Sequence, residues 1–544
     1  MVEVALVGPE IEENLSLRYI ASSLQAAGYR SDLVAFNSSD ALGPALDRIL
    51  SRPVPPRVVG ISLAFQWRAQ DFLALAMALR EMGFAGHITV GGHFATFAAK
   101  ELLIDFPEID SVCRQEAEET VVKLVTALER GTPLTDIPGL ALRSGDDVRF
   151  TEHPQLPDLA TLPWPDRRGS PATCFGHGIA PLVSSRGCYA NCTFCCIAAW
   201  QEQSLPGVRY RLREVDEVAD EMVHLQRARG IDIFVFHDDN FFVPGHKRNV
   251  ARFNALADAL EARGIGPYAT VVKARPTDAD PAVFRILKER LHCIRAYIGI
   301  ETDADQGLRT LRRWAKSSQN HKAIELVRDL DLYTCFNMLI FDPDTTVESL
   351  RTNIEFIRYA AEHPSNFGRV ELYAGTPLLS RMQAEGRVTG DYLQWDYSLG
   401  DSNVERIFEL SMQAFYERNF GEDALANRIM ATRFDIEVCR HFHADRFRPE
   451  WLAEGKALST ALALDSAKGL ETIVDHVEAG RADDHELVTR IAAGLRETER
   501  EVAEAARDLA WRIETVLQRG ASLTDVGDRV ATALQTPRLA LGGL

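Results

Sequence analysis

Three closely spaced cysteines are the residues of this sequence best suited to chemistry. Cys188, Cys192 and Cys195 follow one another with the spacing C-x3-C-x2-C. Three thiolates on one short loop can hold three corners of a cubane iron–sulfur cluster, whereas a four-thiolate cluster or a structural zinc site needs a fourth cysteine. One iron would then stay open to a substrate. The pattern therefore predicts a redox enzyme rather than a structural metalloprotein.

The other cysteines have simpler readings. A zinc site is the alternative for the three thiols, but the sequence has no second CxxC pair to complete it. Cys196 is interpreted as a packing thiol, and it is the spare ligand if one of the three is lost. The rest are scattered singly and are typical of small buried side chains: Cys113, Cys174, Cys293, Cys335 and Cys439.

Length and composition narrow the class of protein. A chain of 544 residues is too long for one core, so two to four domains are expected. The net charge of −18 argues against a general nucleic-acid binder. Nine irregularly spaced cysteines do not resemble a disulfide framework. The sequence opens directly as a strand without a leader, and no run of about 18 apolar residues predicts a membrane span. We expect a cytoplasmic protein without a membrane partner.

The first 150 residues alternate between short apolar runs and helical patterns. This order predicts a Rossmann-like, doubly wound parallel sheet, and ligands bind such sheets at the carboxyl ends of the strands. Strands are expected at 2–7, 31–36, 57–62, 87–92 and 109–112, with helices at 15–27 and 69–82.

A proline-rich linker over 151–174 is expected to precede a second α/β domain over 175–385. Six apolar runs with helices between them predict a partial (β/α)6 TIM-type barrel, whose polar strand exits form a rim. The strands are expected at 181–184, 233–236, 268–274, 293–300, 334–341 and 370–373, with a helix at 215–229.

Residues 386–544 are expected to be all helical, with helices over 404–419 and 484–518. The second carries an apolar stripe of Leu487, Ile491, Leu495, Val502, Ala505, Leu509 and Ile513. A helical cap or dimer face is one interpretation, and a substrate-recognition domain is the other. Tyr392, Trp395 and Tyr397 are either pocket aromatics or ordinary packing residues.

The cysteine motif, with Phe194 before its last cysteine, resembles the radical S-adenosylmethionine (SAM) superfamily. The resemblance covers about 175–385. It implies a [4Fe–4S] cluster whose open iron is chelated by SAM, and an electron donor such as flavodoxin or ferredoxin. Reductive cleavage of SAM would release a 5′-deoxyadenosyl radical.

The same resemblance implies SAM contacts at the strand exits. Asp238 and Asp239 would approach the SAM amino group, and Glu301 would bind the ribose hydroxyls. Asp342 stands where many members have a glycine-proline-glutamate turn near the adenine. Cations near the rim have two readings each. Arg211 and Arg213 would either bind the SAM carboxylate or lie on a solvated face. Lys273 and Arg275 would do the same or bind a substrate anion. Strand alternation points His237 away from Asp238.

Two loops of the N-terminal domain resemble those of cobalamin-binding domains, which have the forms G-G-x-H-x-T and G-E-x-E. Matching residues include Thr96 and Glu118, but the histidine comes one place early, and Gln115 and Ala117 replace glycines. The alternative is a degenerate domain that only packs against the barrel. The Asp-x-His-x-x-Gly signature is absent, so no histidine from that motif ligates cobalt, and the loop from Leu63 to Trp67 would meet the lower face. The implied cobalamin contacts are Ser62, Leu63, Gln66, Gly91, Gly92, His93, Gln115 and Glu116.

Together the resemblances imply a cobalamin-dependent radical SAM enzyme with a small-molecule or peptide substrate. The expected activity is methylation of an unactivated carbon in natural-product biosynthesis. A radical cyclisation or rearrangement without methyl transfer is the first alternative, and a non-catalytic corrinoid sensor is the second.

Overall fold

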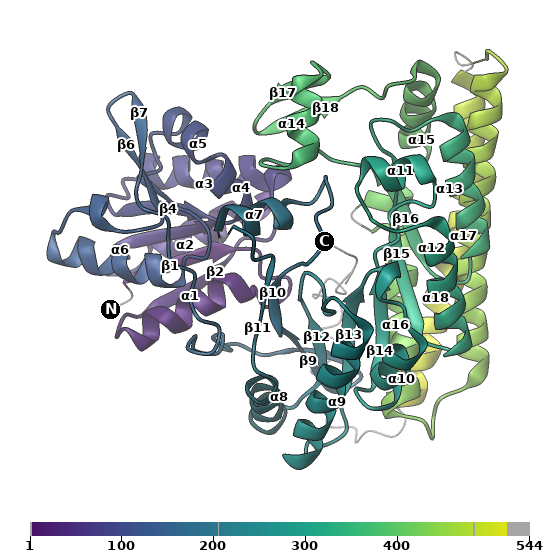
Figure 1. Cartoon of the computed structure of the whole chain (residues 1–544), viewed down its shortest axis with the longest axis horizontal. Helices are drawn as coiled ribbons and strands as arrows, with labels where there is room; N and C mark the ends of the chain where they lie inside the picture. Colours follow the sequence, from purple (N-terminus) through teal and green to yellow (C-terminus); the bar gives the residue numbers. More distant parts are fainter. Residues whose placement is uncertain (1–2, 205, 422, 482–484, 519–544) are drawn as a thin grey trace. The chain divides into compact units, whose positions relative to one another are not determined.

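The computed structural model describes residues 3–204, 206–421, 423–481 and 485–518 (Figure 1). The chain forms two compact units. The first contains the chain up to Ser170, together with Ser185–Glu217 and Glu371–Tyr397. The second contains Pro171–Ser184, Val218–Val370 and the chain from Ser398 onward. These units cut across the domain boundaries predicted from the sequence, because the cysteine loop belongs to the unit of the N-terminal sheet.

The first unit is built on a seven-stranded sheet in the order β2-β1-β3-β4-β5-β6-β7. The first five strands are parallel, which confirms the doubly wound prediction, while β6 and β7 form an antiparallel hairpin at the edge that was not predicted. The strands are β1 (Val4–Gly8), β2 (Ser31–Ala35), β3 (Val58–Ser62), β4 (His87–Gly91), β5 (Ser111–Cys113), β6 (Leu140–Ser144) and β7 (Asp147–Phe150).

Helices cover both faces of this sheet (Figure 1). Alternation along β1 sends Val4 and Leu6 to the core beneath α1 and α6, and Ala5 and Val7 to the core beneath α2, α3 and α5. Asn14 caps α1, because its side-chain oxygen accepts a hydrogen bond from Leu17 N at 3.2 Å. The helices are α1 (Leu15–Ala26), α2 (Leu42–Leu50), α3 (Ala69–Glu81), α4 (His93–Phe97), α5 (Ala99–Asp105) and α6 (Glu118–Arg130).

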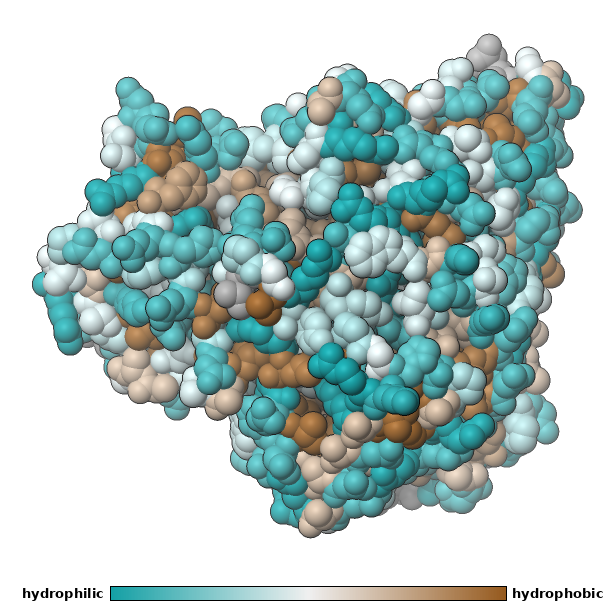
Figure 2. Space-filling view, in the orientation of Figure 1, coloured by the Kyte–Doolittle hydropathy of each residue, from teal (hydrophilic) through white to brown (hydrophobic). Residues whose placement is uncertain are grey.

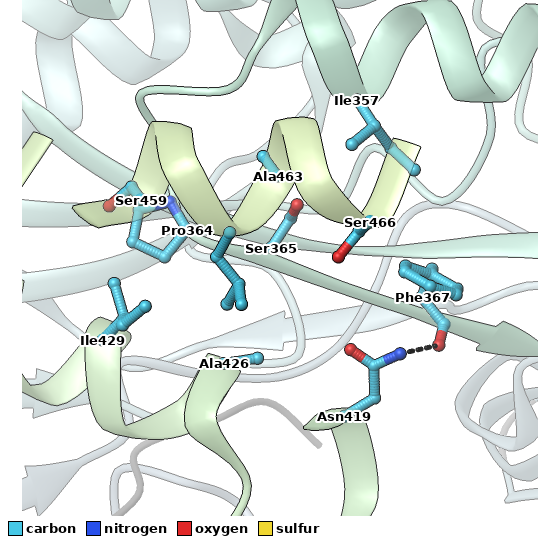
Figure 3. Close-up of a pocket in the computed structure, with 11 residues that line it drawn as sticks. Ile357, Pro364, Ser365, Phe367, Asn419, Ala426, Ile429, Ser459, Ala463 and Ser466 are labelled. Atoms are coloured by element: carbon cyan, nitrogen blue, oxygen red, sulfur yellow. Dashed lines mark hydrogen bonds between the residues drawn. The ribbon is translucent and has the colours of Figure 1, made fainter. Parts of the chain in front are cut away.

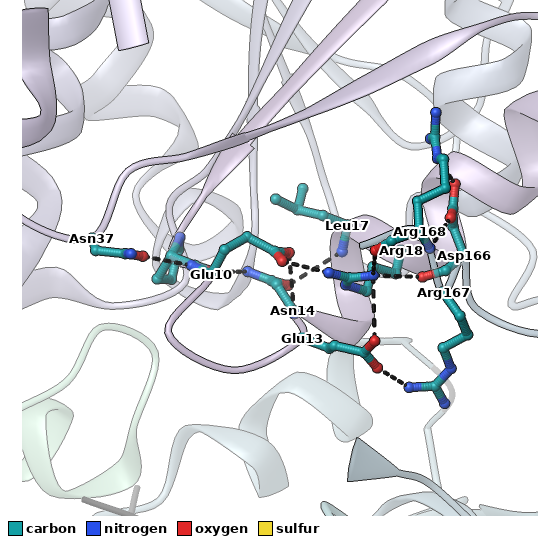
Figure 4. Close-up of polar contacts among 10 residues, drawn as sticks. Glu10, Glu13, Asn14, Leu17, Arg18, Asn37, Asp166, Arg167 and Arg168 are labelled. Carbon is teal, nitrogen blue, oxygen red and sulfur yellow. Dashed lines mark hydrogen bonds and ion pairs between the residues drawn. The ribbon is translucent and has the colours of Figure 1, made fainter. Parts of the chain in front are cut away.

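The proline-rich segment is tied to the first helix by charged groups (Figure 4). Arg18 donates to the backbone oxygens of Asp166 and Arg168 at 2.8 and 3.1 Å and pairs with Glu10 at 2.6 Å. Arg167 pairs with Glu13. The proline-rich segment is therefore fixed in the first unit up to Ser170. The last residues of the predicted linker belong to the second unit and already form a strand.

Two later segments complete the first unit. The cysteine segment contains the hairpin of β10 (Ser185–Gly187) and β11 (Tyr210–Leu212), with α7 (Cys196–Ser204) between them. The segment after the barrel contains α14 (Pro377–Ala384) and the hairpin of β17 (Val388–Asp391) and β18 (Gln394–Tyr397). The sequence predicted helices alone after Pro377, so this second hairpin is a correction.

The second unit contains a seven-stranded sheet in the order β16-β15-β14-β13-β12-β9-β8. Six strands are parallel and confirm the partial barrel, and β8 adds an antiparallel edge strand within the segment predicted as a linker. The strands are β8 (Ala172–Cys174), β9 (His177–Leu182), β12 (Ile231–Phe236), β13 (Ala269–Ala274), β14 (Cys293–Ile298), β15 (Tyr333–Phe341) and β16 (Ser365–Arg369).

The prediction of a sixth barrel strand at 370–373 is wrong. The strand is β16, whose residues Ser365–Arg369 pair with β15. Residues 370–373 form no strand, although Val370 and Leu372 are buried.

Helices alternate with these strands and then form a bundle. The alternating helices are α8 (Val215–Arg229), α9 (His246–Ala262), α10 (Pro281–Glu289), α11 (Asp305–Thr310), α12 (Ser317–Asp329) and α13 (Val347–Tyr359). The bundle consists of α15 (Ser402–Phe420), α16 (Leu425–Phe442), α17 (Pro449–Glu478) and α18 (His485–Gln518).

The bundle is part of the barrel core as well as a cover. Met430, Phe434 and Val438 of α16 pack against Ile233 and Val271 of the sheet. A small cavity of about 10 Å³ lies where α15, α16 and α17 meet β16, and Asn419 donates to Phe367 O beside it (Figure 3). Such a volume admits one water at most, so the bundle holds no ligand there.

The predicted stripe of α18 needs one correction. Ala506 is buried, whereas Ala505 is exposed. The Leu487 side chain lies outside the described residues. On the face seen in Figure 2, hydrophilic side chains predominate and apolar ones are scattered. Among the described residues, no helix has the length and apolarity needed to span a membrane.

Candidate functional site

The three cysteines lie on the loop between β10 and α7. Cys192 is buried, Cys188 and Cys195 are half-buried, and none forms a disulfide. Ala190 N lies 3.4 Å from Cys188 Sγ, and Cys195 N donates to Cys192 O at 3.3 Å, so the loop folds back on itself. Phe194 is half-buried beside Cys195, and Cys196 begins α7. Three thiols on one tight loop fit the donor set of a cubane cluster.

No group of three or more His, Cys, Asp or Glu side chains is arranged to hold a single metal ion within the described residues. A cubane binds each thiolate at a different iron, so this finding concerns mononuclear sites only.

The exits of β3, β4 and β5 are joined at the carboxyl edge of the first sheet. Leu63 N donates to Gly91 O at 2.7 Å, and Ala95 N donates to Leu63 O at 3.2 Å. Gln115 N donates to Thr96 Oγ1 at 3.0 Å. The two loops that resemble cobalamin-binding loops therefore lie together with the loop after β3, at the edge where doubly wound folds bind ligands.

This edge has features that fit a large ligand rich in amide groups. Gly92 has a φ of +111°, and a Cβ there would lie 2.9 Å from the backbone of Ala64. Gln66 is buried, and its Oε1 has no hydrogen-bond partner among the described residues. Ser62 is half-buried and Trp67 is 63% exposed, but Leu63 is completely buried and offers only its backbone. Cobalamin carries peripheral amides that can satisfy Gln66.

His93 is the first residue of α4 and is packed against the cysteine segment. Its ring lies 4.3 Å from the ring of Trp200 in α7. Burial lowers the pKa of His93 to about 4. The imidazole is therefore neutral at pH 7 and serves as a packing group there.

Acid is expected to destabilise the apoprotein through His93. An unfolded histidine titrates near 6.5, so the unfolded state takes up the proton first as the pH falls. Stability is retained above that value and is lost as the pH falls toward 4, by about 3 kcal/mol between pH 7 and pH 4. Urea unfolding of wild-type protein and of His93→Phe measures the effect. Between pH 7 and pH 4, the unfolding free energy of the wild-type protein should fall by this amount relative to that of His93→Phe. Parallel pH profiles of the two proteins would contradict a buried, neutral His93.

Gln115 and Glu116 contact the cysteine segment. Ser204 Oγ donates to Gln115 Oε1, and Glu116 pairs with Arg186 and Arg211. Both predicted cobalamin residues thus have protein partners, and their partners lie within or beside the hairpin that leads into Cys188.

In the second unit, Asp238 lies at the exit of β12, and its carboxylate is hydrogen-bonded within the protein. It is fully buried, and its carboxylate accepts hydrogen bonds from Ser184 N at 3.0 and 3.2 Å and from Ser184 Oγ at 2.8 Å. Arg252 also donates to Ser184 Oγ at 2.5 Å. The carboxylate therefore fixes the chain just before the cysteine segment. Asp239, the next residue, is exposed at the rim.

Glu301 has the features of a functional carboxylate. It follows β14 with a φ of +64°, which is uncommon for a residue other than glycine and is typical of functional sites. Burial raises its pKa, while Arg313 and Arg275 oppose the shift. Its Oε1 lies 3.9 Å from Arg313 Nη2. A Cβ on Gly299 would lie 2.9 Å from Glu301 Oε1, so this glycine makes room for the carboxylate.

Two other residues predicted to bind SAM have partners within the protein. Asp342 is buried and closes a turn, in which its Oδ1 accepts from Asp344 N at 3.0 Å and its N donates to Thr345 Oγ1 at 2.8 Å. Arg213 is buried in the first unit and pairs with Glu217 at 2.9 Å.

The three aromatics after the barrel are packing residues. Tyr392 stacks on Phe94 with ring centroids 6.3 Å apart, and Trp395 packs against the core of the first unit. Tyr397 is buried. Sequence reasoning missed Tyr373, whose pKa is raised by burial and by the neighbouring Glu371, with smaller contributions from Cys196 and Cys195.

An open cleft of about 650 Å³ lies beside the loop after α11. Its lining includes Arg309, Arg312, Lys316 and Asp305, with Trp314 64% exposed. Three cations against one carboxylate suit an anionic group.

Comparison with known proteins decides the family. The B12 binding domain model matches residues 4–125, and the Radical SAM superfamily model matches residues 182–357. The chain belongs to the cobalamin-dependent radical SAM enzymes. These two domain families imply cobalamin, SAM and a [4Fe–4S] cluster as cofactors.

Curated relatives of this enzyme include hopanoid C-3 methylase of Methylococcus capsulatus, 28% identical over 398 residues that cover 71% of each chain. The anaerobic magnesium-protoporphyrin IX monomethyl ester cyclase of Cereibacter sphaeroides is 24% identical, over 70% of this chain and 61% of the cyclase. The solved structure of the cobalamin-dependent SAM radical enzyme OxsB, with aqua-cobalamin and SAM bound, superimposes with a TM-score of 0.65 at 16% identity. It covers 97% of this chain and 81% of that one. At this identity the likeness establishes the fold.

Proposed function

We propose that this enzyme is a C-methyltransferase that acts on an unactivated carbon of a natural-product or peptide intermediate. The observation that carries the proposal is that one compact unit contains both the B12-binding sheet and the three-cysteine loop. The similarity to hopanoid C-3 methylase supports methyl transfer.

The residues of the chain have distinct tasks in this proposal. When bound, the cluster and SAM supply a radical that abstracts hydrogen, and cobalamin supplies the methyl group. Cys188, Cys192 and Cys195 hold the cluster. Glu301 accepts hydrogen bonds from the ribose hydroxyls, and the loops after β3 and β4 hold the corrinoid. Flavodoxin or ferredoxin supplies the electron in this proposal.

The test needs no knowledge of the substrate. The full chain is reconstituted anaerobically with iron, sulfide and hydroxocobalamin, reduced, and given SAM with a labelled methyl group. A methyltransferase should form S-adenosylhomocysteine with the label on the corrinoid, and also 5′-deoxyadenosine. Absence of both products would contradict the proposal.

A cyclase or rearrangement enzyme is the second candidate, supported by the similarity to the magnesium-protoporphyrin cyclase. It should form 5′-deoxyadenosine without transferring the label to the corrinoid. A corrinoid-binding sensor should cleave no SAM.

A further inference from the structure

Two carboxylates bind the hairpin that leads into the cluster loop: Glu116 lies just before α6, and Glu118 is its first residue. Arg186 Nη1 lies 2.5 Å from Glu116 Oε2, and Arg186 Nη2 lies 2.6 Å from Glu118 Oε1. Glu116 also pairs through its other oxygen with Arg211. All four residues belong to the first compact unit.

The hairpin itself creates the need for these carboxylates. Arg186 and Arg211 are directly paired in the antiparallel ladder of β10 and β11. Side chains opposite each other in such a ladder lie on the same face, where two like charges repel. Glu116 bridges the two guanidiniums, and Arg211 also donates to Pro157 O at 2.8 Å. Glu118 balances the remaining charge, so the four groups are neutral together.

The network is shielded from water. The side chains of Glu116 and Glu118 are 8% and 6% exposed, and that of Arg186 is 17% exposed. Tyr19 covers the Arg186 guanidinium, whose carbon lies 4.9 Å from the ring centroid. Burial alone would lower the pKa of Arg186, but Glu118 and Glu116 raise it overall. Buried charges of this kind are strongly coupled, because losing one leaves its partner unpaired.

The backbone between Arg186 and Cys188 transmits this anchoring. The single intervening residue, Gly187, has a φ of +87°. A Cβ at Gly187 would collide with Arg209 O and lie 2.9 Å from Gln201 Cδ. The chain is thus held between Arg209, just before β11, and Gln201 of α7, immediately before the first predicted cluster ligand, so the position of Arg186 fixes that of Cys188.

We propose that Glu116 and Glu118 are positioning residues for the cluster, acting through Arg186, rather than ligands of the corrinoid. Their loop also joins the corrinoid-facing edge, since the neighbouring Gln115 N is bonded to Thr96 of the β4 exit. The same carboxylates therefore tie the cluster loop to the edge predicted to hold cobalamin. This inference rests on the proposed function.

The test compares Glu116→Gln, Glu118→Gln and Arg186→Lys with wild-type protein. Glu119→Gln is the matched control, because Glu119 lies on the same helical turn but pairs with Lys123 at the surface. In the apoprotein, the rate of Cys188 alkylation by iodoacetamide is followed by peptide mass spectrometry, with Cys174 as the internal reference. After reconstitution, iron content, the EPR spectrum of the reduced cluster with and without SAM, and corrinoid absorbance are measured.

The three network variants should alkylate Cys188 at least about fivefold faster, with Cys174 unchanged. They should also lose iron or show an altered EPR spectrum, while corrinoid binding and the Glu119→Gln control stay at the wild-type level. Loss of corrinoid with an unchanged EPR spectrum and alkylation rate would overturn the proposal, as would wild-type behaviour in all measurements.

Two further results separate other failures. If Glu116→Gln does not fold, Glu118→Asp and Arg211→Lys decide the question through the same alkylation assay, and unchanged Cys188 rates in both would overturn the proposal. A wild-type protein that binds iron but cleaves no SAM would instead defeat the proposed function, and the alkylation assay of the apoprotein would still test the network.

Discussion

Replacing Cys188, Cys192 and Cys195 together with alanine should remove the cluster and abolish SAM cleavage. Iron should fall from about four atoms per chain to background, since cubane clusters are held by cysteine thiolates. Formation of 5′-deoxyadenosine should fall at least about a thousandfold, because the cofactor carries the difficult chemistry. Iron analysis and product chromatography of the reconstituted protein measure both effects.

Cys196→Ala is the control for this experiment. Cys196 follows the last of the three cysteines but begins α7. Its replacement by alanine should leave iron content and SAM cleavage close to the wild-type values. The triple variant should still bind cobalamin, because the B12-binding sheet does not include these thiols. A triple variant that retains iron and activity would defeat the interpretation of the whole chain. Loss of the cluster in Cys196→Ala would indicate that Cys196, rather than Cys195, is the third ligand.

The sequence predicted the strands of the first sheet closely because their apolar side chains fill the local cores on both faces of the sheet. The third strand, expected at 57–62, is Val58–Ser62, and the fourth, expected at 87–92, is His87–Gly91. The last barrel strand was misplaced because β16 is an edge strand with the polar sequence Ser365–Arg369. Val370 and Leu372 beyond it are buried without forming a strand, so their apolarity alone could not separate the two cases.

The sequence predicted which residue types follow the strands, but it could not predict the hydrogen-bond and ion-pair partners of those residues. Asp238 could be placed after a strand, but nothing local indicated that Ser184 would occupy its carboxylate. Glu116 and Arg186 are separated by 70 positions in the sequence and meet only through the tertiary fold. The sequence did contain one signal for this contact. Glu116 and Glu118 are two carboxylates near a predicted helix start, and Arg186 is a cation just before the cysteine motif, so an ion pair between them was possible.

Replacing Gly92 with alanine should have the largest effect on corrinoid binding among substitutions at the sheet edge. The new Cβ would meet the backbone of Ala64 and Leu63 at 2.9 Å, so the loop after β3 must move. The positive φ and the overpacking together should lower the free energy of unfolding by about 2–4 kcal/mol. Because the displaced loop is predicted to face cobalamin, affinity for hydroxocobalamin should fall at least about tenfold, which corresponds to 1.4 kcal/mol.

Gly83→Ala separates the effect of backbone strain from the effect of the collision. Gly83 has a similar φ of +84°, but nothing lies within 4 Å of a Cβ built there. It should lose only the strain contribution of about 1–2 kcal/mol in urea unfolding, with corrinoid affinity unchanged. Iron content should remain at the wild-type level in both variants, since the nearest atoms to a Cβ at Gly92 belong to Ala64 and Leu63, and a Cβ at Gly83 would meet nothing. Equal corrinoid affinities in the two variants would show that the loop after β3 does not shape the cobalamin site, and the site would then have to be sought elsewhere along the carboxyl edge.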